Sequence, residues 1–250
     1  MYSRVPMGMF EASLPCERTQ RRFAVANSEP TQLMASPPLL QIALDSIHSH
    51  EIFRVADLIR EAVDILEVGT VLLKKEGTQV VSALKERFPD KLIFVDTKTL
   101  DLGKIEAQVM FEAGADIMSV CGVASDATIG LVLREAHALG KQVMIDLIGL
   151  GDCYRQVKRL SALQPDYLTV YTGIDERTTE NTLFEKLEII SQISPIPVAV
   201  SGGVELDDLP YLLVFRPAII IVGTAITRAS RPDEVAQRFW ESIHYSPLLS

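Results

Sequence analysis

Short apolar runs alternate with amphipathic stretches along the chain from residue 39 onward. The runs are nearly continuous and rich in β-branched residues, as expected for strands buried on both faces of a parallel sheet. The intervening stretches repeat their apolar positions with helical spacing, for example across residues 126–139. The predicted strands cover residues 39–44, 64–68, 92–96, 116–121, 142–147, 166–171, 196–200 and 218–222.

Eight strand–helix pairs in about 200 residues predict one (β/α)8 barrel, or TIM barrel, as the catalytic domain over residues 39–250. The alternative is a doubly wound open sheet, but the glycine-rich phosphate loop that follows the first strand of such sheets is missing. The chain has 250 residues, of which 48% are hydrophobic, so it can bury a core of this size.

Residues 1–38 differ from the rest, since they contain arginines but no lysine and lack a clear hydrophobic period. We interpret them as an N-terminal extension that is either a disordered tail or untranslated, with Met34 as the true start. A weak organelle-targeting peptide is a further alternative, although Glu11, Glu17 and Glu29 argue against it. The apolar segment of a secretory signal is missing.

Composition narrows the classes of partner and compartment. A formal net charge of -9 argues against a nucleic-acid surface, which needs clustered Lys and Arg, but leaves room for a locally positive pocket. No apolar run approaches the ~20 residues needed to cross a membrane. Three cysteines without close spacing form neither a disulfide framework nor a zinc motif, so a reducing, cytoplasmic location is the simplest expectation.

Polar residues gather where the predicted strands end. Catalytic groups of a (β/α)8 barrel project from the C-terminal ends of its strands. Packing alone would not put charges there, because burying an unpaired carboxylate is unfavourable. The strand-end residues are Asp45, Glu67, Thr70, Asp96, Lys98, Asp101, Asp146, Tyr171, Ser201, Gly202, Gly203, Gly223 and Thr224.

Asp96 and Lys98 are the most informative pair among them. Residues i and i+2 of a strand face the same side, so both side chains are expected at the barrel mouth, with Thr97 pointing outward. A carboxylate beside an ammonium group can hold a metal, polarise a substrate and tune the lysine. The alternative is an ion pair that only stabilises the rim, and Asp45 and Asp146 could equally cap the helices that follow them.

Two glycine turns predict a phosphate site. Barrels of this type often bind phosphate with the loops after strands 7 and 8. Ser201-Gly202-Gly203 and Gly223-Thr224 occupy those two loops. Glycine allows backbone N–H groups to approach an anion without a Cβ in the way. We therefore expect a phosphorylated small molecule as the ligand.

The segment Asp96-Thr97-Lys98-Thr99-Leu100-Asp101 matches the Asp-x-Lys-x-x-Asp motif of the orotidine-monophosphate decarboxylase suprafamily. Within it, residues 39–245 resemble the group of 3-hexulose-6-phosphate synthase and 3-keto-L-gulonate-6-phosphate decarboxylase. The matching segments are residues 40–45, 66–70, 172–175, 201–204 and 222–227.

The resemblance implies a carbon–carbon lyase acting on a phosphorylated sugar. It implies Mg²⁺ held near Glu67 and Asp96, since magnesium prefers oxygen ligands. It also implies an enediolate intermediate stabilised by the metal and Lys98, because a preorganised cation lowers the barrier where negative charge develops. In the family Asp101 comes from the neighbouring subunit, which implies a homodimer with shared active sites.

Three positions bear on the reaction. Decarboxylases of the group carry Glu at the strand-5 position, Arg shortly after strand 6 and Thr before the double glycine, where this chain has Asp146, Ile174 and Ser201. The first two resemble the synthase, an aldehyde-lyase that condenses formaldehyde with D-ribulose 5-phosphate, whereas Ser201 matches neither pattern. The decarboxylase, a carboxy-lyase, is the alternative.

Tyr171 departs from both subgroups, which carry His at the end of strand 6. An unperturbed tyrosine has a pKa near ~10 and is a poor proton carrier at neutral pH. Three outcomes follow: Tyr171 serves as the donor in the synthase, the chemistry has shifted to another phosphosugar, or the chain is a non-catalytic phosphosugar-binding protein.

Overall fold

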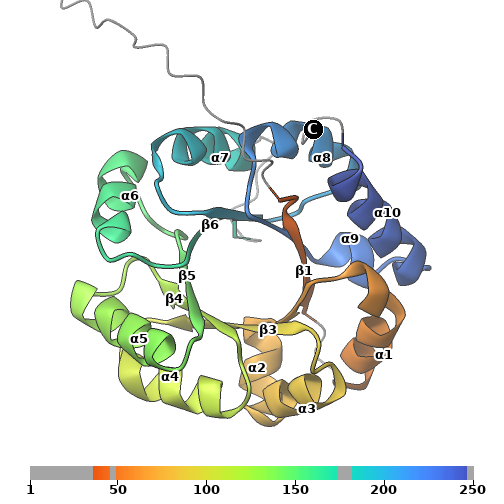
Figure 1. Cartoon of the computed structure of the whole chain (residues 1–250), viewed down its shortest axis with the longest axis horizontal. Coiled ribbons are helices and arrows are strands. Elements are labelled where there is room, and N and C mark those ends of the chain that lie inside the picture. Colours follow the sequence, from red (N-terminus) through yellow and green to blue (C-terminus); the bar gives the residue numbers. More distant parts are fainter. Residues whose placement is uncertain (1–35, 46–48, 174–181, 247–250) are drawn as a thin grey trace, which may run out of the picture. The chain divides into compact units, whose positions relative to one another are not determined.

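A computed structural model describes residues 36–45, 49–173 and 182–246. In it eight parallel strands close into a barrel in sequence order, with β8 hydrogen-bonded back to β1, and helices surround the barrel (Figure 1). The predicted (β/α)8 barrel is confirmed, and the open sheet is wrong because β1 and β8 pair. The strands are β1 (Leu39–Leu44), β2 (Ile65–Val68), β3 (Leu92–Thr99), β4 (Ile117–Cys121), β5 (Gln142–Asp146), β6 (Tyr167–Tyr171), β7 (Val198–Ser201) and β8 (Ile219–Val222).

The helices pack against the outside of the strands. The helix predicted from residues 126–139 is α5, whose first turn is capped by the Ser125 hydroxyl accepting from the Thr128 amide. None of the helices in the described ranges is long and apolar enough to span a bilayer. The α-helices are α1 (Ser49–Ile59), α2 (Thr70–Glu76), α3 (Gln79–Arg87), α4 (Gly103–Glu112), α5 (Asp126–Ala138), α6 (Cys153–Ser161), α7 (Thr182–Ile193), α8 (Leu209–Leu212), α9 (Thr224–Thr227) and α10 (Pro232–His244).

The core has two parts, which explains why the strands read as continuous apolar runs. Side chains that point outward from the barrel pack against the helices, as Ile42 and Val95 do. Side chains that point inward fill the barrel interior. The inner cluster consists of Ala43, Ile65, Phe94, Ile117, Met144, Ala199, Ile219 and Ile221.

Strand β3 differs from the prediction in length and regularity. It continues to Thr99 instead of ending at residue 96, and its pairing with β4 is irregular between Val95 and Thr99. Lys98 has a φ of 48°, a left-handed conformation that non-glycine residues rarely adopt. Asp96 and Lys98 nevertheless face the same side, as predicted, since Nζ of Lys98 lies 3.0 Å from Oδ2 of Asp96.

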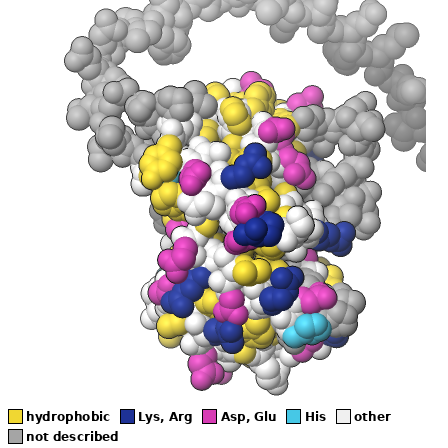
Figure 2. Space-filling view, turned by 90° about the vertical axis from the view of Figure 1, so that its right-hand side faces the viewer, with side chains coloured by type: hydrophobic (Ala, Val, Ile, Leu, Met, Phe, Trp, Pro, Cys, Tyr) yellow, Lys and Arg dark blue, Asp and Glu magenta, His cyan; other side chains and the backbone are white. Residues whose placement is uncertain are grey.

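The predicted N-terminal extension covers residues 1–38, of which residues 1–35 lie outside the described part of the chain. The described chain enters β1 at Leu39, where the barrel was expected to begin. On the face that Figure 2 shows, acidic and basic side chains are interspersed and do not gather into a single basic patch.

Candidate active site

A cavity of about 370 Å³ opens at the C-terminal ends of the strands. This cavity is lined by all the strand-end residues that the sequence analysis identified, with the exception of Asp101. Because the residues come from β1, β2, β3, β5, β6, β7 and β8 or the turns after them, only barrel closure brings them together. The barrel therefore assembles the candidate site as its topology predicts.

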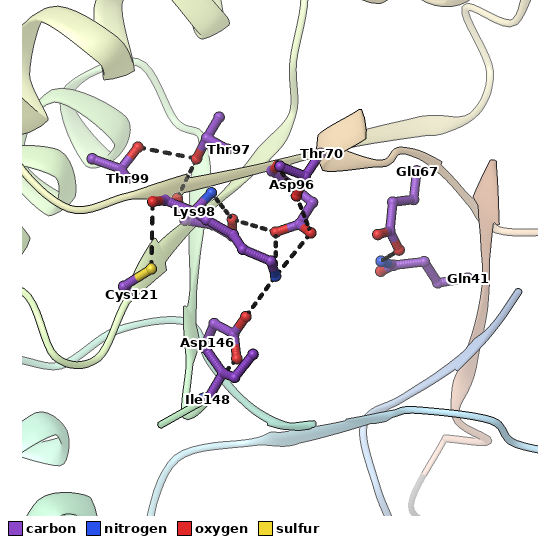
Figure 3. A network of polar contacts seen from close by, with 11 residues as sticks. Gln41, Glu67, Thr70, Asp96, Thr97, Lys98, Thr99, Cys121, Asp146 and Ile148 are labelled. Atoms are coloured by element: carbon purple, nitrogen blue, oxygen red, sulfur yellow. Dashed lines mark hydrogen bonds and ion pairs between the residues drawn. The ribbon is translucent and has the colours of Figure 1, made fainter. Parts of the chain in front are cut away.

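Lys98 lies at the centre of the polar groups. Its Nζ is 2.9 Å from Oδ2 of Asp146 and 3.0 Å from Oδ2 of Asp96. The same Nζ is 5.1 Å from the centroid of the Tyr171 ring, within cation–π range. The cluster thus joins the ends of β3, β5 and β6 around one ammonium group, and Figure 3 shows the contacts of Lys98 with Asp96 and Asp146.

Two hydroxyl groups hold Asp96 in place. Thr70 donates to Oδ2 of Asp96 at 2.7 Å, and Ser119 donates to Oδ1 at 2.8 Å. Ser119 also accepts from the backbone N–H of Lys98 at 2.9 Å, so one buried hydroxyl fixes both members of the pair. Carboxylates with several donors keep one orientation, which preorganises the site.

Electrostatics keep Lys98 charged. Burial alone would lower the pKa of Lys98, but Asp96 and Asp146 outweigh it and hold that pKa above its ordinary value. Burial raises the pKa of the Asp146 carboxyl, and Lys98 only partly offsets this effect. Lys98 is therefore a fixed positive charge at neutral pH and not a base.

The interpretation of Asp146 as a helix cap is wrong. Its Oδ1 accepts from the backbone N–H of Ile148 at 2.9 Å, within the turn that follows β5. Asp152 caps α6 instead, by accepting from the N–H of Arg155. The side chain of Asp146 is directed to Lys98 because its own strand ends at the cavity.

Glu67 and Asp45 form a second acidic group in the cavity. Glu67 is 7% exposed and accepts from Nε2 of Gln41 at 2.7 Å. Burial, followed by Asp96 and Asp45, raises the pKa of Glu67 well above its ordinary value. The Asp45 carboxylate lies close to the turn after β2, since its Oδ1 would be 1.9 Å from a Cβ placed on Gly69. A larger residue at position 69 would therefore displace the Asp45 carboxylate.

These carboxylates partly fit a magnesium site. Asp96 and Asp45 disfavour the charged form of Glu67, and a divalent cation would relieve that. In the part of the chain that the structure describes, no three acidic, histidine or cysteine side chains are grouped closely enough to hold a metal alone. Magnesium commonly keeps several waters, so one or two carboxylates suffice.

The two glycine turns follow β7 and β8, and the second of them lies beside Asp45 because β8 pairs with β1. Gly202 and Gly203 have φ of 118° and 84°, a conformation that favours glycine. A Cβ on Gly202 would also lie 3.0 Å from the backbone nitrogen of Thr172. Gly223 precedes the short helix α9, and Arg228 at its end lines the cavity. Apart from Lys98, Arg228 is the one cationic side chain among the described lining residues.

Asp101 lies apart from the cavity of its own chain. It is exposed, in the bend between β3 and α4. Large apolar side chains around it are also exposed, among them Leu100 at 56%, Leu102 at 64% and Ile105 at 58%. Within one chain the motif therefore brings together Asp96 and Lys98 but not Asp101.

Sequence reasoning missed Ser119 and Arg228. Ser119 lies in the middle of the apolar strand β4, and a single polar residue in such a run is the signal that could have identified it. Arg228 follows α9 and resembles any surface arginine in the sequence. Of the positions used to distinguish the reactions, Ile174 lies outside the described residues.

Comparisons with known proteins agree on this architecture. 3-Hexulose-6-phosphate synthase of Mycobacterium gastri is 33% identical over 204 residues, which cover 82% of this chain and 99% of that protein. The structure of 3-hexulose-6-phosphate synthase from Salmonella typhimurium matches with a TM-score of 0.80 and 34% identity, over 82% of this chain and 98% of that one. 3-Keto-L-gulonate-6-phosphate decarboxylase from Vibrio cholerae matches with a TM-score of 0.74 and 28% identity, over 83% and 98%.

The family comparison covers nearly the whole barrel. A sequence model described as orotidine 5'-phosphate decarboxylase / HUMPS family matches residues 38–239. These limits span every strand and reach into α10. The chain belongs to the orotidine 5'-phosphate decarboxylase / HUMPS family.

Proposed function

We propose that this chain is a 3-hexulose-6-phosphate synthase, an aldehyde-lyase that condenses formaldehyde with D-ribulose 5-phosphate. The observation that carries the proposal is Lys98, held as a fixed cation 2.9 Å from Asp146 and 3.0 Å from Asp96 inside a cavity of sugar-phosphate size. A cation preorganised in this way stabilises an enediolate better than water does, because it needs no reorientation when the charge forms. The synthase relatives support this assignment.

The two sides of the cavity suit the two ends of the substrate. We assign the phosphate to the side with Gly202, Gly203 and Gly223, where Arg228 supplies a positive charge and the glycines allow close approach of backbone N–H groups. The carbonyl end then lies beside Lys98. This orientation separates the phosphate from Asp96, which would repel it, because at least two strands lie between β3 and either of the strands that the glycine turns follow.

We assign proton transfer to Asp146 and Tyr171. Asp146 removes a proton from C1 of ribulose 5-phosphate, and Lys98 stabilises the resulting enediolate oxygen. C1 then forms a bond with the carbonyl carbon of formaldehyde, whose π electrons move to its oxygen. Tyr171 donates a hydrogen bond to that oxygen, which takes up the proton that Asp146 removed, and the product is 3-hexulose 6-phosphate. The raised pKa of Asp146 suits a base better than an ordinary carboxylate does.

We assign Glu67 and Asp96 as the residues that would hold Mg²⁺. When bound, the ion supplies positive charge next to the developing oxygen anions. Gln41 keeps Glu67 oriented through its 2.7 Å hydrogen bond, and Thr70 and Ser119 do the same for Asp96.

The decarboxylase remains the second candidate, since decarboxylase structures match at 25–28% identity. Its substrate carries a carboxylate in addition to the phosphate. Among the described residues lining the cavity, Lys98 is already engaged by two carboxylates and Arg228 lies on the glycine side. A second substrate anion therefore lacks a dedicated cation there, which favours the synthase.

We propose that two chains form a homodimer in which Asp101 of each completes the site of the other. Asp101 does not line its own cavity and lies among exposed apolar residues, Leu100, Leu102, Ile105 and Val109. Contiguous apolar surface of this kind is typical of a protein interface. Packing a second copy there would cover it and bring two aspartates to shared sites.

The first test is formaldehyde consumption by the purified protein with ribulose 5-phosphate, with and without Mg²⁺. Exchange of the C1 proton in D₂O, measured by NMR without formaldehyde, reports enediolate formation separately. Metal-dependent loss of formaldehyde together with exchange supports the synthase. Exchange without loss of formaldehyde indicates that another acceptor is used. If the protein binds the sugar phosphate but shows neither exchange nor loss of formaldehyde, it is a binding protein.

A further inference from the structure

Tyr171 borders two cavities. One is the catalytic cavity of about 370 Å³, and the other is a smaller cavity of about 20 Å³ that reaches between β6, α6 and α7. Among the described residues, Tyr171 is the one that lines both. Tyr171 therefore borders both spaces, and its ring faces Lys98 on the side of the larger one.

The smaller cavity is mainly apolar. Leu147 and Leu150 follow β5, Val157 comes from α6, Val170 from β6 and Ile190 from α7. Its volume is close to what a single water molecule requires, so no sugar phosphate fits there. Cys153, Gln156 and Lys186 complete its lining, so an alkyl substituent fits only with the added room of a shorter side chain at position 171.

The boundary between the cavities lies beside the reacting groups. The Tyr171 ring centroid is 5.1 Å from Nζ of Lys98, and Leu147 directly follows Asp146 in the chain. An aldehyde that reaches C1 of an enediolate held by Lys98 has to fit next to this ring. A substituent on the aldehyde would meet Tyr171 before it met the apolar cavity.

We propose that Tyr171 determines acceptor specificity by closing the apolar cavity, which restricts the aldehyde to the size of formaldehyde. This inference rests on the proposed synthase function. Shortening the side chain joins the two cavities and gives an alkyl substituent an apolar place. The chemistry stays the same, since C1 bonds to the aldehyde carbon and the aldehyde oxygen takes up the proton.

The test compares condensation of ribulose 5-phosphate with formaldehyde and with propionaldehyde in the presence of Mg²⁺. Y171L and Y171A are expected to raise the ratio of propionaldehyde to formaldehyde kcat/KM at least ~10-fold, because one or two methylenes in an apolar pocket are worth that much. Y171F keeps the ring and is expected to keep the ratio while the overall rate falls. L150A enlarges the apolar cavity but leaves the boundary, so its ratio should match the wild type.

Proton exchange at C1 separates the possible failures. A ratio that stays flat in Y171L and Y171A overturns the inference, and so does loss of exchange in both, because a boundary residue is not required to form the enediolate. An altered ratio in L150A alone also overturns it. If the wild type shows neither exchange nor formaldehyde loss, the proposed function itself fails and the inference falls with it.

Discussion

Nζ of Lys98 lies 2.9 Å from Oδ2 of Asp146, so one ion pair joins the end of β3 to the end of β5 across the mouth of the barrel. Ser119 on the intervening strand β4 connects to the same group through Asp96 and the N–H of Lys98. The candidate site is thus attached to three consecutive strands, and its geometry depends on the barrel and not on one flexible loop.

Replacing Lys98 with Met should reduce the condensation rate by at least ~10²–10³-fold, the loss typical when one preorganised stabilising group is removed. Methionine keeps the apolar stem but leaves the enediolate oxygen without its cation. The measurement is kcat for formaldehyde loss, with far-UV circular dichroism to establish that the barrel is retained. K158M is the control, because Lys158 is exposed on α6 and lies outside the catalytic cavity. Near-normal turnover in K98M would contradict the assigned role.

Glu67→Gln should stabilise the metal-free protein at neutral pH. The folded-state pKa of Glu67 is raised by burial, Asp96 and Asp45, so the wild type loses stability as pH rises above its ordinary value of 4.5. Glutamine does not ionise and avoids this loss. We expect Tm at pH 8 in EDTA to exceed the wild-type value by at least ~2 °C, a shift that is significant for a domain of this size. The difference should vanish near pH 4.

Added Mg²⁺ should make the wild type more stable than E67Q. A ligand that binds only the folded state raises Tm with its concentration, so Mg²⁺ should stabilise the wild type and leave E67Q nearly unchanged. Glu61→Gln removes an exposed carboxylate outside the cavity and serves as the control, with a wild-type response expected. Equal Mg²⁺ responses of wild type and E67Q would argue against Glu67 as a ligand.

The sequence predicted the barrel because its strands are apolar on both faces and its polar residues concentrate at their ends. It also predicted that Asp96 and Lys98 share one cavity. The left-handed conformation of Lys98 was not predictable, because it depends on the irregular pairing of β3 with β4. The partnership of Lys98 with Asp146 was equally hidden, since the two residues lie 48 positions apart and only barrel closure joins them.

Arg228→Ala should raise KM for ribulose 5-phosphate about 10-fold with little change in kcat. A charge-assisted hydrogen bond to phosphate contributes about 1.5–3 kcal/mol, and the exposure of Arg228 places its contribution at the lower end. Inhibition by inorganic phosphate should weaken in parallel. Arg134→Ala, an exposed arginine outside the cavity, is the matched control. A fall in kcat with unchanged KM would exclude a phosphate-binding role.

Two inactive variants should restore activity to each other if the sites are shared. K98M lacks the lysine of its own site but retains Asp101, and D101A is the reverse. A heterodimer of the two contains one site with both residues intact and one with neither. Random mixing makes half of all dimers heterodimers, so about one quarter of wild-type activity should return.

The measurement is formaldehyde loss after the two variants are mixed, briefly dissociated and reassociated, with each variant treated alone as the control. Ile105→Asp places a charge among the exposed apolar residues near Asp101 and should prevent dimer formation. Adding I105D to either member should therefore abolish the recovery, and the I105D chain alone should be monomeric and inactive by light scattering and assay. A fully active monomer, or D101A with normal turnover, would show that each chain completes its own site.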